Sequence, residues 1–334
     1  MKRHGGLFEK ILTFENLALA VRKAVRGKKD RESVARFYFS WETEVLALER
    51  ELRSGTWRPR PYTTFEIFEP KPRRICAAHI RDRVVHHAVC NIVEPLLDRT
   101  MIHDTYACRR GKGTHAAVER ARRFARKYPF FLKCDIRKYF ETVDHEVLKD
   151  LLLRKFKDAA LLALLFRIID HPVPGGAPGK GLPIGNLTSQ WFANAYLGEL
   201  DHFLKDRLAV KGYLRYMDDF LLFGTDKPTL HRRLSDIRRF LSDVLGLEIR
   251  EEITIVAPTF QGIPFLGYRV YPGTVRLKRE NRARLGRKVK HLEAAYAAGK
   301  IDETRLSDSV RSLAAHTAGA DTLRLRRKLF SGLG

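Results

Sequence analysis

Two adjacent aspartates stand between two short apolar runs, and this feature constrains the fold more than any other. The tetrapeptide Tyr216-Met217-Asp218-Asp219 follows Tyr213 and Leu214 and precedes the run Phe220 to Phe223. The pattern predicts two short strands joined by a tight turn. Like charges repel at a hairpin tip, and the flanking strands offer only Arg215 as a nearby cation. The pair is therefore either an exposed Asp-Asp turn or a site that something positive compensates.

A further carboxylate closes an apolar run earlier in the chain. The segment Phe130 to Ile136 predicts a buried strand, and Asp135 lies near its end. Taken alone, Asp135 is equally compatible with a helix cap or a turn. Together with Asp218 and Asp219 it supplies oxygen ligands that could converge on Mg²⁺. Two such ions, about 4 Å apart, would activate an attacking hydroxyl and stabilise a leaving pyrophosphate, and we predict such a site, in which Mn²⁺ can substitute.

The charge balance predicts a polyanionic partner. The 334 residues include 63 Lys and Arg against 39 Asp and Glu, which gives a net charge of +24. The apolar content of 44% argues against disorder. No apolar run reaches the ~18–20 residues of a membrane span, and no signal-peptide segment is evident, so we expect a cytoplasmic protein without membrane contacts. The cysteines lack metal-site spacing and are expected to be buried small apolar residues: Cys76, Cys90, Cys108 and Cys134.

The order of predicted elements indicates an α+β fold, with helices on one face of a small antiparallel sheet. Helical patterns cover residues 7–53 and 79–97, the latter stopping near Pro95. A strand is predicted at 64–68 and a loop at 70–74. Further helices are predicted at about 144–157, 158–170, 189–208 and 230–245, and further strands at 253–256 and 264–271, before a basic helical tail.

Four segments, in this order and spacing, resemble the motifs of reverse transcriptases. They are Leu132 to Phe140, Gly181 to Gln190, Tyr216 to Asp219, and Phe265 to Tyr268. The resemblance covers about residues 60–275 and implies a right-hand polymerase fold of fingers, palm and short helical thumb. It divides the chain into an N-terminal helical extension or fingers (1–60), fingers (61–129), palm (130–272, with a fingers insertion at about 145–180) and basic thumb (273–334).

The resemblance also implies roles for individual residues. Asp135, Asp218 and Asp219 would be catalytic and bind both metals, with the Ile136 carbonyl as an extra ligand. Phe140 would exclude the 2′-hydroxyl of ribonucleotides, unless it is a core aromatic. The implied nucleotide contacts are Arg74, Arg137, Lys138, Tyr139, Phe140, Ile184 and Met217.

Cations near residue 73 and in the tail have two interpretations each. Lys71, Arg73 and Arg74 either bind the triphosphate, with Arg74 preferred for its bidentate fork, or form a solvated basic loop. The tail either grips the nucleic-acid backbone or is a solvated face. The implied template and primer contacts are Gln190, Phe265, Leu266, Gly267, Arg276, Lys278, Arg279 and Arg282.

The sequence departs from the common family pattern in two places, and the first of them indicates a subgroup of the family. Ile184 stands where a glutamine is common and Gln190 where a proline is common, as in the enzymes of diversity-generating retroelements. Ile253 stands where a lysine often serves as proton donor to pyrophosphate, so we place no catalytic acid there. The remaining length leaves no room for an RNase H or endonuclease domain, so we expect other proteins to remove the template and cut the target.

The subgroup resemblance implies an RNA-directed DNA polymerase that makes errors at template adenines. Its partners would be an RNA template, a DNA or RNA primer, deoxynucleoside triphosphates and a small, basic, helical accessory protein. The alternatives are a group II intron-like, retron or phage-defence reverse transcriptase. A non-enzyme alternative is an RNA-binding scaffold that keeps the fold without catalysis.

Overall fold

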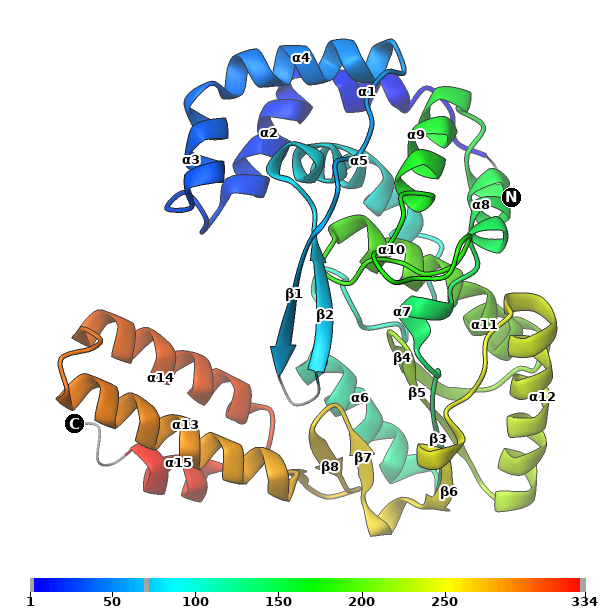
Figure 1. The fold of residues 1–334 in the computed structure, drawn as a ribbon. Coiled ribbons are helices and arrows are strands. Elements are labelled where there is room, and N and C mark those ends of the chain that lie inside the picture. Colours follow the sequence, from blue (N-terminus) through cyan, green and yellow to red (C-terminus); the bar gives the residue numbers. More distant parts are fainter. Residues whose placement is uncertain (1–2, 69–71, 331–334) are drawn as a thin grey trace. The chain divides into compact units, whose positions relative to one another are not determined.

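A computed structural model describes residues 3–68 and 72–330 of the chain (Figure 1). The chain divides into two compact units. Unit 1 comprises Met1–His103, Ile136–Arg207 and Ile237–Ile249, and unit 2 comprises Asp104–Asp135, Leu208–Asp236 and Arg250–Gly334. One boundary between the units therefore falls between Asp135 and Ile136, inside the first predicted motif. The domain boundaries expected from the sequence remain predictions.

Unit 1 is mostly helical. The apolar face of α2 is fully buried at helical spacing (Leu17, Val21, Ala24), and the Thr13 side chain caps the helix by accepting from the amide of Asn16. The helices predicted over residues 7–53 are confirmed as four separate helices. The α-helices that lie wholly in this unit are α1 Phe8–Leu12, α2 Phe14–Val25, α3 Glu32–Phe39, α4 Trp41–Arg53, α5 Ile80–Asp98, α7 Tyr139–Thr142, α8 His145–Lys155, α9 Ala159–Ile169, α10 Leu187–Tyr196 and α11 Gly198–His202, and a π-helical turn, Phe203–Arg207, follows α11.

The helix predicted at 79–97 is confirmed as α5, which ends at Asp98, three residues after Pro95; a proline in the last turn removes only one of its hydrogen bonds. One expectation for unit 1 is wrong. The loop predicted at 70–74 is strand from Pro72 onward, since β2 (Pro72–Ala77) pairs in antiparallel register with β1 (Thr63–Phe68). Lys71 lies outside the described residues.

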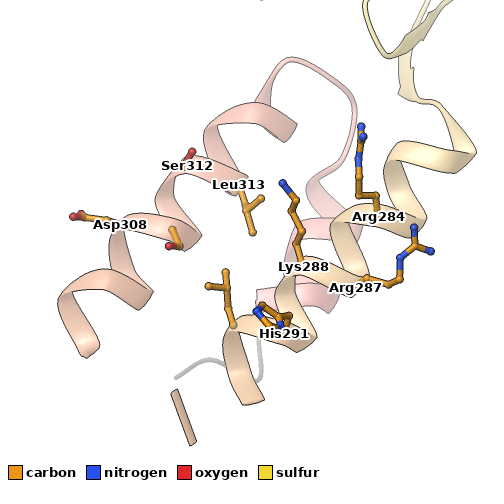
Figure 2. A pocket seen from close by; sticks show the side chains of 9 residues that line it. Arg284, Arg287, Lys288, His291, Asp308, Ser312 and Leu313 are labelled. Carbon is orange, nitrogen blue, oxygen red and sulfur yellow. The ribbon is translucent and has the colours of Figure 1, made fainter. Parts of the chain in front are cut away.

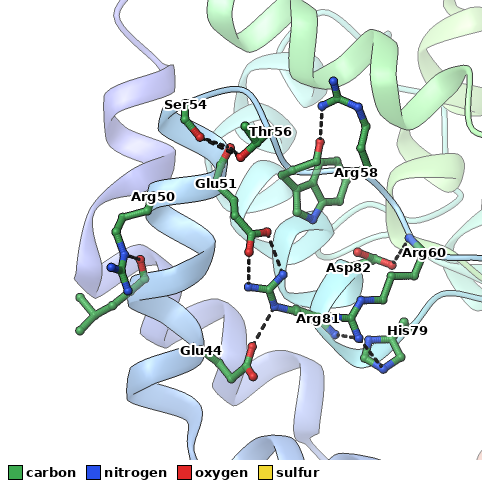
Figure 3. Close-up of polar contacts among 12 residues, drawn as sticks. Glu44, Arg50, Glu51, Ser54, Thr56, Arg58, Arg60, His79, Arg81 and Asp82 are labelled. Carbon is green, nitrogen blue, oxygen red and sulfur yellow. Dashed lines mark hydrogen bonds and ion pairs between the residues drawn. The ribbon is translucent and has the colours of Figure 1, made fainter.

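A partly buried ion-pair network links α4, which precedes the β1–β2 hairpin, to α5, which follows it (Figure 3). Arg81, at the start of α5, donates from Nε to Glu44 at 2.8 Å and through both Nη atoms to Glu51 at 2.8 Å. The hydrogen bonds that Glu51 accepts from Arg81 are the main reason that the pKa of Glu51 is lower than its usual value. The buried Asp82 carboxylate accepts from the backbone amide of Arg60 at 2.8 Å, just before β1. The network thus ties α4, α5 and the strand entry together.

Unit 2 contains the four-stranded antiparallel sheet that holds the third resemblance motif and the beginning of the first, Leu132 to Asp135. Its strand order is β4-β5-β3-β6, with β3 at Phe130–Asp135, β4 at Gly212–Tyr216, β5 at Asp219–Gly224 and β6 at Ile255–Pro258. Helix α6 (Thr114–Lys127) belongs to the same core: its Ala117, Ala121 and Phe124 cluster with Phe131 and Leu221 of the sheet. The predicted strands at 130–136 and 213–223 are confirmed.

A second sheet of unit 2 corrects another expectation. The single strand predicted at 264–271 is two strands, because Leu266 (φ +47°) and Gly267 (φ +86°) turn the chain between them. The three strands are β7 Ile263–Phe265, β8 Tyr268–Val270 and β9 Val275–Leu277. Residues 251–253 form a 3₁₀ turn, so the strand predicted from 253 begins only at Ile255, and a second 3₁₀ turn covers Thr259–Gln261. The described residues therefore form three small sheets rather than one.

The long helix and the basic helical tail predicted from the sequence are confirmed. They comprise α12 Lys227–Leu245, whose residues divide between the units, and α13 Arg279–Ala297, α14 Glu303–Ala318 and α15 Leu323–Phe330 in unit 2. In the described parts of the chain, no helix has the length and apolar character to cross a membrane. Three cysteines are buried as expected, but Cys108 is exposed, since it lies in a turn with φ +56°.

Candidate active site

The predicted carboxylates lie on two paired strands of unit 2. Asp135 at the end of β3 stands opposite Asp219 at the start of β5, and Asp219 pairs with Tyr216 across the β4–β5 turn. Met217 and Asp218 form the two-residue loop. Met217 has φ +56° and is 9% exposed, although a left-handed residue in such a loop is normally glycine or asparagine. The structure thus places Asp135, at the end of β3, beside the strained turn that contains Asp218 and leads into Asp219.

Asp219 is held in an environment that disfavours its negative charge. Burial, together with the charges of Asp135 and Asp218, raises the pKa of Asp219 to about 7. The Lys133 ammonium opposes this shift from 2.6 Å away, between Nζ and Oδ1. Lys133 is itself 7% exposed. An added cation at these carboxylates would stabilise the charged form further.

The donor chemistry of this cluster fits a hard divalent cation. All three side chains offer carboxylate oxygens, which Mg²⁺ prefers over nitrogen or sulfur. Over residues 3–68 and 72–330, however, no group of three or more His, Cys, Asp or Glu side chains is already arranged as a metal-binding set. The residues therefore suit the ion by type, while the ligand set is not preformed.

The backbone on either side of Ile136 is fixed by two hydrogen bonds. Within unit 2 the Arg250 amide donates to the Asp135 carbonyl at 2.8 Å, and within unit 1 the Arg137 amide donates to the Glu248 carbonyl at 2.8 Å. Both bonds flank the antiparallel bridge between Ile136 and Ile249 and neither uses the Ile136 carbonyl. Its role as a metal ligand remains a prediction.

A segment that the sequence did not indicate supports the outer edge of the four-stranded sheet. Arg215 donates its amide to the Asp104 carbonyl at 2.9 Å, and the Tyr106 amide donates to the Arg215 carbonyl at 2.9 Å. The Thr114 hydroxyl donates to the Tyr216 hydroxyl at 3.3 Å. Residues 104–106 thus run beside β4, with Thr105 in a parallel bridge to Arg215.

The predicted nucleotide contacts after Asp135 lie in unit 1 and differ in exposure. Arg137 and Lys138 are exposed, and Lys138 (φ +46°) is the residue before α7. Tyr139 is 2% exposed and donates its hydroxyl to the Ala193 carbonyl, which makes it a core residue. Phe140 is half-buried, with its ring centroid 5.7 Å from that of Tyr139. Of this group, the Tyr139 side chain is thus the least accessible to a nucleotide.

Ile184 lies in a loop that is bonded to β2. Its carbonyl accepts from the Cys76 amide at 2.8 Å, and the Asn186 side chain donates to the Cys76 carbonyl at 3.2 Å. Gly185 has φ +114°, and a Cβ there would lie 2.8 Å from the Ile75 side chain, so the close approach requires glycine. The Ile184 side chain is half-buried, as is that of Gln190 on α10.

Arg74, the preferred triphosphate contact, is exposed on β2. Its Nη1 donates to the Pro174 carbonyl at 3.1 Å in the glycine- and proline-rich loop. A bond to one neutral carbonyl leaves other guanidinium donors of this exposed side chain for solvent or a ligand.

The segment that resembles a primer grip is docked on the first tail helix. The Phe265 side chain is fully buried in the core of unit 2. The Gly267 carbonyl accepts from the Asn281 side chain at 2.8 Å and from the Lys278 amide at 3.2 Å. The Leu266-Gly267 turn is thereby held against the start of α13.

The tail contains two hollows lined by cations. The larger, of about 640 Å³, lies between α13 and α14 (Figure 2) and is lined by Arg284, Arg287, Lys288, His291, Leu292, Asp308, Ser309, Ser312 and Leu313. The smaller, of about 420 Å³, is lined by Arg276, Leu277, Arg282, Asp321, Thr322, Arg324, Leu325 and Lys328. Arg276 and Arg282 thus share one hollow, whereas Lys278 and Arg279 line neither. Arg324 and Lys328 were not among the predicted residues, although α15 is visibly basic in the sequence.

Several known proteins are similar to this chain in sequence. The chain is similar to protein YkfC of Escherichia coli, with 26% identity over 273 residues, which cover 68% of this chain and 71% of that protein. It is also similar to the group II intron-encoded protein LtrA of Lactococcus lactis, with 21% identity over 75% of this chain and 52% of LtrA. A yeast putative COX1/OXI3 intron 1 protein is 25% identical over 48% of this chain and 20% of that protein. The chain thus spans about half of LtrA and a fifth of the yeast protein.

Similar folds occur among telomerases. The apo telomerase of Candida tropicalis, truncated of its C-terminal domain, matches with a TM-score of 0.52 and 12% identity, over 71% of this chain and 60% of that chain. At this identity the likeness concerns the fold, which is the right-hand polymerase fold expected from the sequence. The family model described as "Reverse transcriptase (RNA-dependent DNA polymerase)" matches residues 69–270, which include β3, β4 and β5 with all three aspartates. The chain therefore belongs to the reverse transcriptase family.

Proposed function

We propose that this chain is an RNA-directed DNA polymerase that extends a primer 3′-hydroxyl with deoxynucleotides on an RNA template. The observation that carries the proposal is the carboxylate cluster on β3 and the β4–β5 turn, inside the part of the chain that matches the family. An RNA-binding scaffold would have no use for three neighbouring carboxylates, of which Asp219 has its charge disfavoured by partial burial and by Asp135 and Asp218.

In this proposal Asp135, Asp218 and Asp219 hold two Mg²⁺ ions, with the Ile136 carbonyl as an additional ligand. When bound, such ions activate the attacking hydroxyl and neutralise charge on the leaving pyrophosphate. The Lys133 ammonium, 2.6 Å from Asp219, favours the ionised form of this carboxylate against the burial and the neighbouring aspartates that raise its pKa, and a bound cation would favour that form further. The left-handed conformation of Met217 determines the position of the Asp218 Cα atom, from which the carboxylate side chain extends.

Unit 1 would recognise the nucleotide. Arg74 donates to the triphosphate, with Arg137 and Lys138 adding positive charge, and Phe140 excludes the 2′-hydroxyl. The basic tail of unit 2 would contact the template–primer backbone without sequence preference, with Arg276 and Arg282 joined by Arg324 and Lys328 around one hollow. The cytoplasm is the proposed compartment.

Primer extension tests the proposal. The purified chain is given an RNA template, a labelled DNA primer, the four deoxynucleoside triphosphates and Mg²⁺. We expect elongated DNA that is lost when EDTA is added, or when the RNA is digested beforehand. Template binding without elongation in either Mg²⁺ or Mn²⁺ would instead support the RNA-binding scaffold.

For the biological role we propose the error-prone enzyme of a diversity-generating retroelement, assisted by a small basic helical accessory protein. The support is the resemblance at Ile184 and Gln190. An intron-encoded reverse transcriptase is the second candidate, because LtrA and the yeast protein are named as intron proteins. The flanking DNA separates them: two near-identical repeats that differ mainly at adenines favour the retroelement, and an intron ribozyme favours the alternative.

Ile184→Gln tests whether this residue limits fidelity. Isoleucine has no hydrogen-bonding group, whereas glutamine could position the nascent pair. One positioning hydrogen bond contributes roughly 0.5–1.5 kcal/mol, so errors should fall by up to about tenfold. Misincorporation opposite each template base is compared by sequencing products of equal length. An unchanged error spectrum would show that Ile184 only packs in its loop.

A further inference from the structure

Strand β4 contains a fully buried arginine next to the aspartate turn. Arg215 has 0% exposure, and its Nη1 donates to the carbonyl of Met217 at 3.0 Å. A guanidinium is always charged and carries five donors, so its burial is costly unless those donors are bonded. Arg215 lies two residues before Met217, and the hydrogen bond to the Met217 carbonyl links this buried guanidinium directly to the turn.

The backbone of Arg215 is fixed on both edges. One edge pairs with Phe220 of β5, and the other is bonded to Asp104 and Tyr106. The guanidinium therefore extends from a rigid strand. One of the atoms to which it donates, the Met217 carbonyl oxygen, belongs to the two-residue loop. The Met217 carbonyl is therefore held at a fixed position relative to the sheet.

The Met217 carbonyl is part of the peptide that leads into Asp218. Met217 is left-handed at φ +56°, a conformation that its side chain disfavours. The peptide would rotate toward a relaxed conformation if nothing held it. A charge-assisted hydrogen bond to the carbonyl opposes this rotation and fixes the direction in which the Asp218 side chain leaves the turn.

We propose that Arg215 is a positioning residue for the aspartate turn: its buried guanidinium holds the strained Met217–Asp218 peptide and so orients Asp218 and Asp219 for cation binding. The consequence for catalysis rests on the proposed polymerase function. The positioning itself is a property of the chain without metal or substrate, and can be measured in that state.

The test compares Arg215→Met with three other variants of the full chain. Arg215→Lys keeps the charge but loses the planar fork, and Met217→Gly removes the disfavoured conformation because glycine adopts positive φ freely. Arg120→Met is the control: it removes a half-buried arginine of unit 2, whose side chain is 32% exposed and pairs with the Asp104 carboxylate at 2.9 Å. The readouts are hydrogen exchange of peptides across 213–223 without metal, thermal unfolding, and Mn²⁺ binding followed by electron paramagnetic resonance.

We expect Arg215→Met to speed exchange at residues 217–219 by about tenfold and to weaken Mn²⁺ binding by a similar factor. Adding Met217→Gly to Arg215→Met should restore much of both losses, and Arg120→Met should lower the unfolding temperature without a selective effect at the turn. If Arg215→Met does not fold, Arg215→Lys is expected to show the same pattern at smaller size. Exchange that rises equally over β3, β5 and α6, with no rescue by glycine, would overturn the proposal. A wild-type chain that fails to extend primers, while these exchange effects hold, would refute the polymerase function and leave the positioning role standing.

Discussion

The aspartate turn of unit 2 and the β1–β2 hairpin of unit 1 differ in how their charged side chains are exposed. In unit 2 the sheet buries charged side chains around one turn, with Lys133 at 7%, Arg215 at 0% and Asp104 at 4% exposure. In unit 1 the β1–β2 hairpin is exposed along all of β1, and the predicted contacts Arg74, Arg137 and Lys138 are on the surface. This difference is what the proposed function requires: fixed carboxylates at the aspartate turn and accessible cations on the hairpin.

This comparison makes a general expectation for variants. Changes at recognition residues of unit 1 should alter which nucleotide is accepted, or at what concentration, while extension persists. Changes at the carboxylates of unit 2 should remove extension altogether. The distinction would be wrong if a variant at these residues of unit 1 removed extension altogether, or if a carboxylate variant of unit 2 changed only the choice or concentration of nucleotide.

The largest effect expected in unit 1 is at Phe140. Phe140→Ala should admit ribonucleotides, because the ring no longer occupies the space that a 2′-hydroxyl needs. A steric clash of roughly 1–3 kcal/mol corresponds to about ten- to a hundredfold in selectivity. The measurement is alkali-sensitive product formed from mixed nucleotides, with Phe166→Ala, another half-buried aromatic of unit 1, as the control. Unchanged selectivity with intact extension would make Phe140 a core residue.

A second prediction concerns the buried histidine of unit 1. Burial, with nearby His87, His171 and Arg83, lowers the pKa of His86 to about 3. His86 is thus neutral in the folded chain, while the unfolded chain takes up a proton below about pH 6.5. Its stabilising contribution is complete above that pH and is lost as the pH falls, by about 2 kcal/mol at pH 5.

Urea unfolding at pH 7.5 and pH 5 measures this loss. In the wild-type chain the free energy of unfolding should be lower at pH 5 than at pH 7.5. His86→Leu should reduce this difference by about 2 kcal/mol, since it removes the group that titrates. The same difference in both proteins would show that His86 does not control the acid sensitivity of the fold.

The smallest effect is expected on the exposed hairpin. Arg74→Ala should raise the KM for deoxynucleoside triphosphates about tenfold, at the lower end of a charge-assisted hydrogen bond because the site is exposed. The rate at saturating nucleotide should change little. Arg36→Ala on α3 is the matched control, as its guanidinium is 81% exposed and pairs only locally, with Glu32. Equal KM values for the two variants would assign Arg74 to a solvated surface.

The sequence predicts the central hairpin well because its signal is local. Short continuous apolar runs on both sides of the turn predict the two strands, and Asp135 likewise lies near the end of an apolar run. Helix faces in the first fifty residues are equally readable from their spacing. These features depend on neighbours in sequence, which a single chain displays.

The rest of the site depends on neighbours in space. Lys133 lies two residues before Asp135, so strand alternation would place it on the same face, but its pairing with Asp219 requires the β3–β5 register. Residues 104–106 carry no strand pattern and reach β4 only through tertiary contacts. The Leu266-Gly267 turn lies within a largely apolar stretch, which the pattern predicts as one strand. Arg324 and Lys328 of α15 are distant from Arg276 in sequence and line the same hollow only in the folded chain.

The most direct test of the central claim is primer extension by Asp135→Asn and Asp218→Asn beside Asp226→Asn. All three changes remove one carboxylate charge from unit 2, but Asp226 caps α12 by accepting from the Thr229 amide at 2.7 Å, a role that asparagine can keep. We predict that the first two variants lose extension by about a thousandfold or more while still binding RNA, and that Asp226→Asn extends like wild type. Near-wild-type extension by Asp135→Asn or Asp218→Asn in Mg²⁺ would contradict the account.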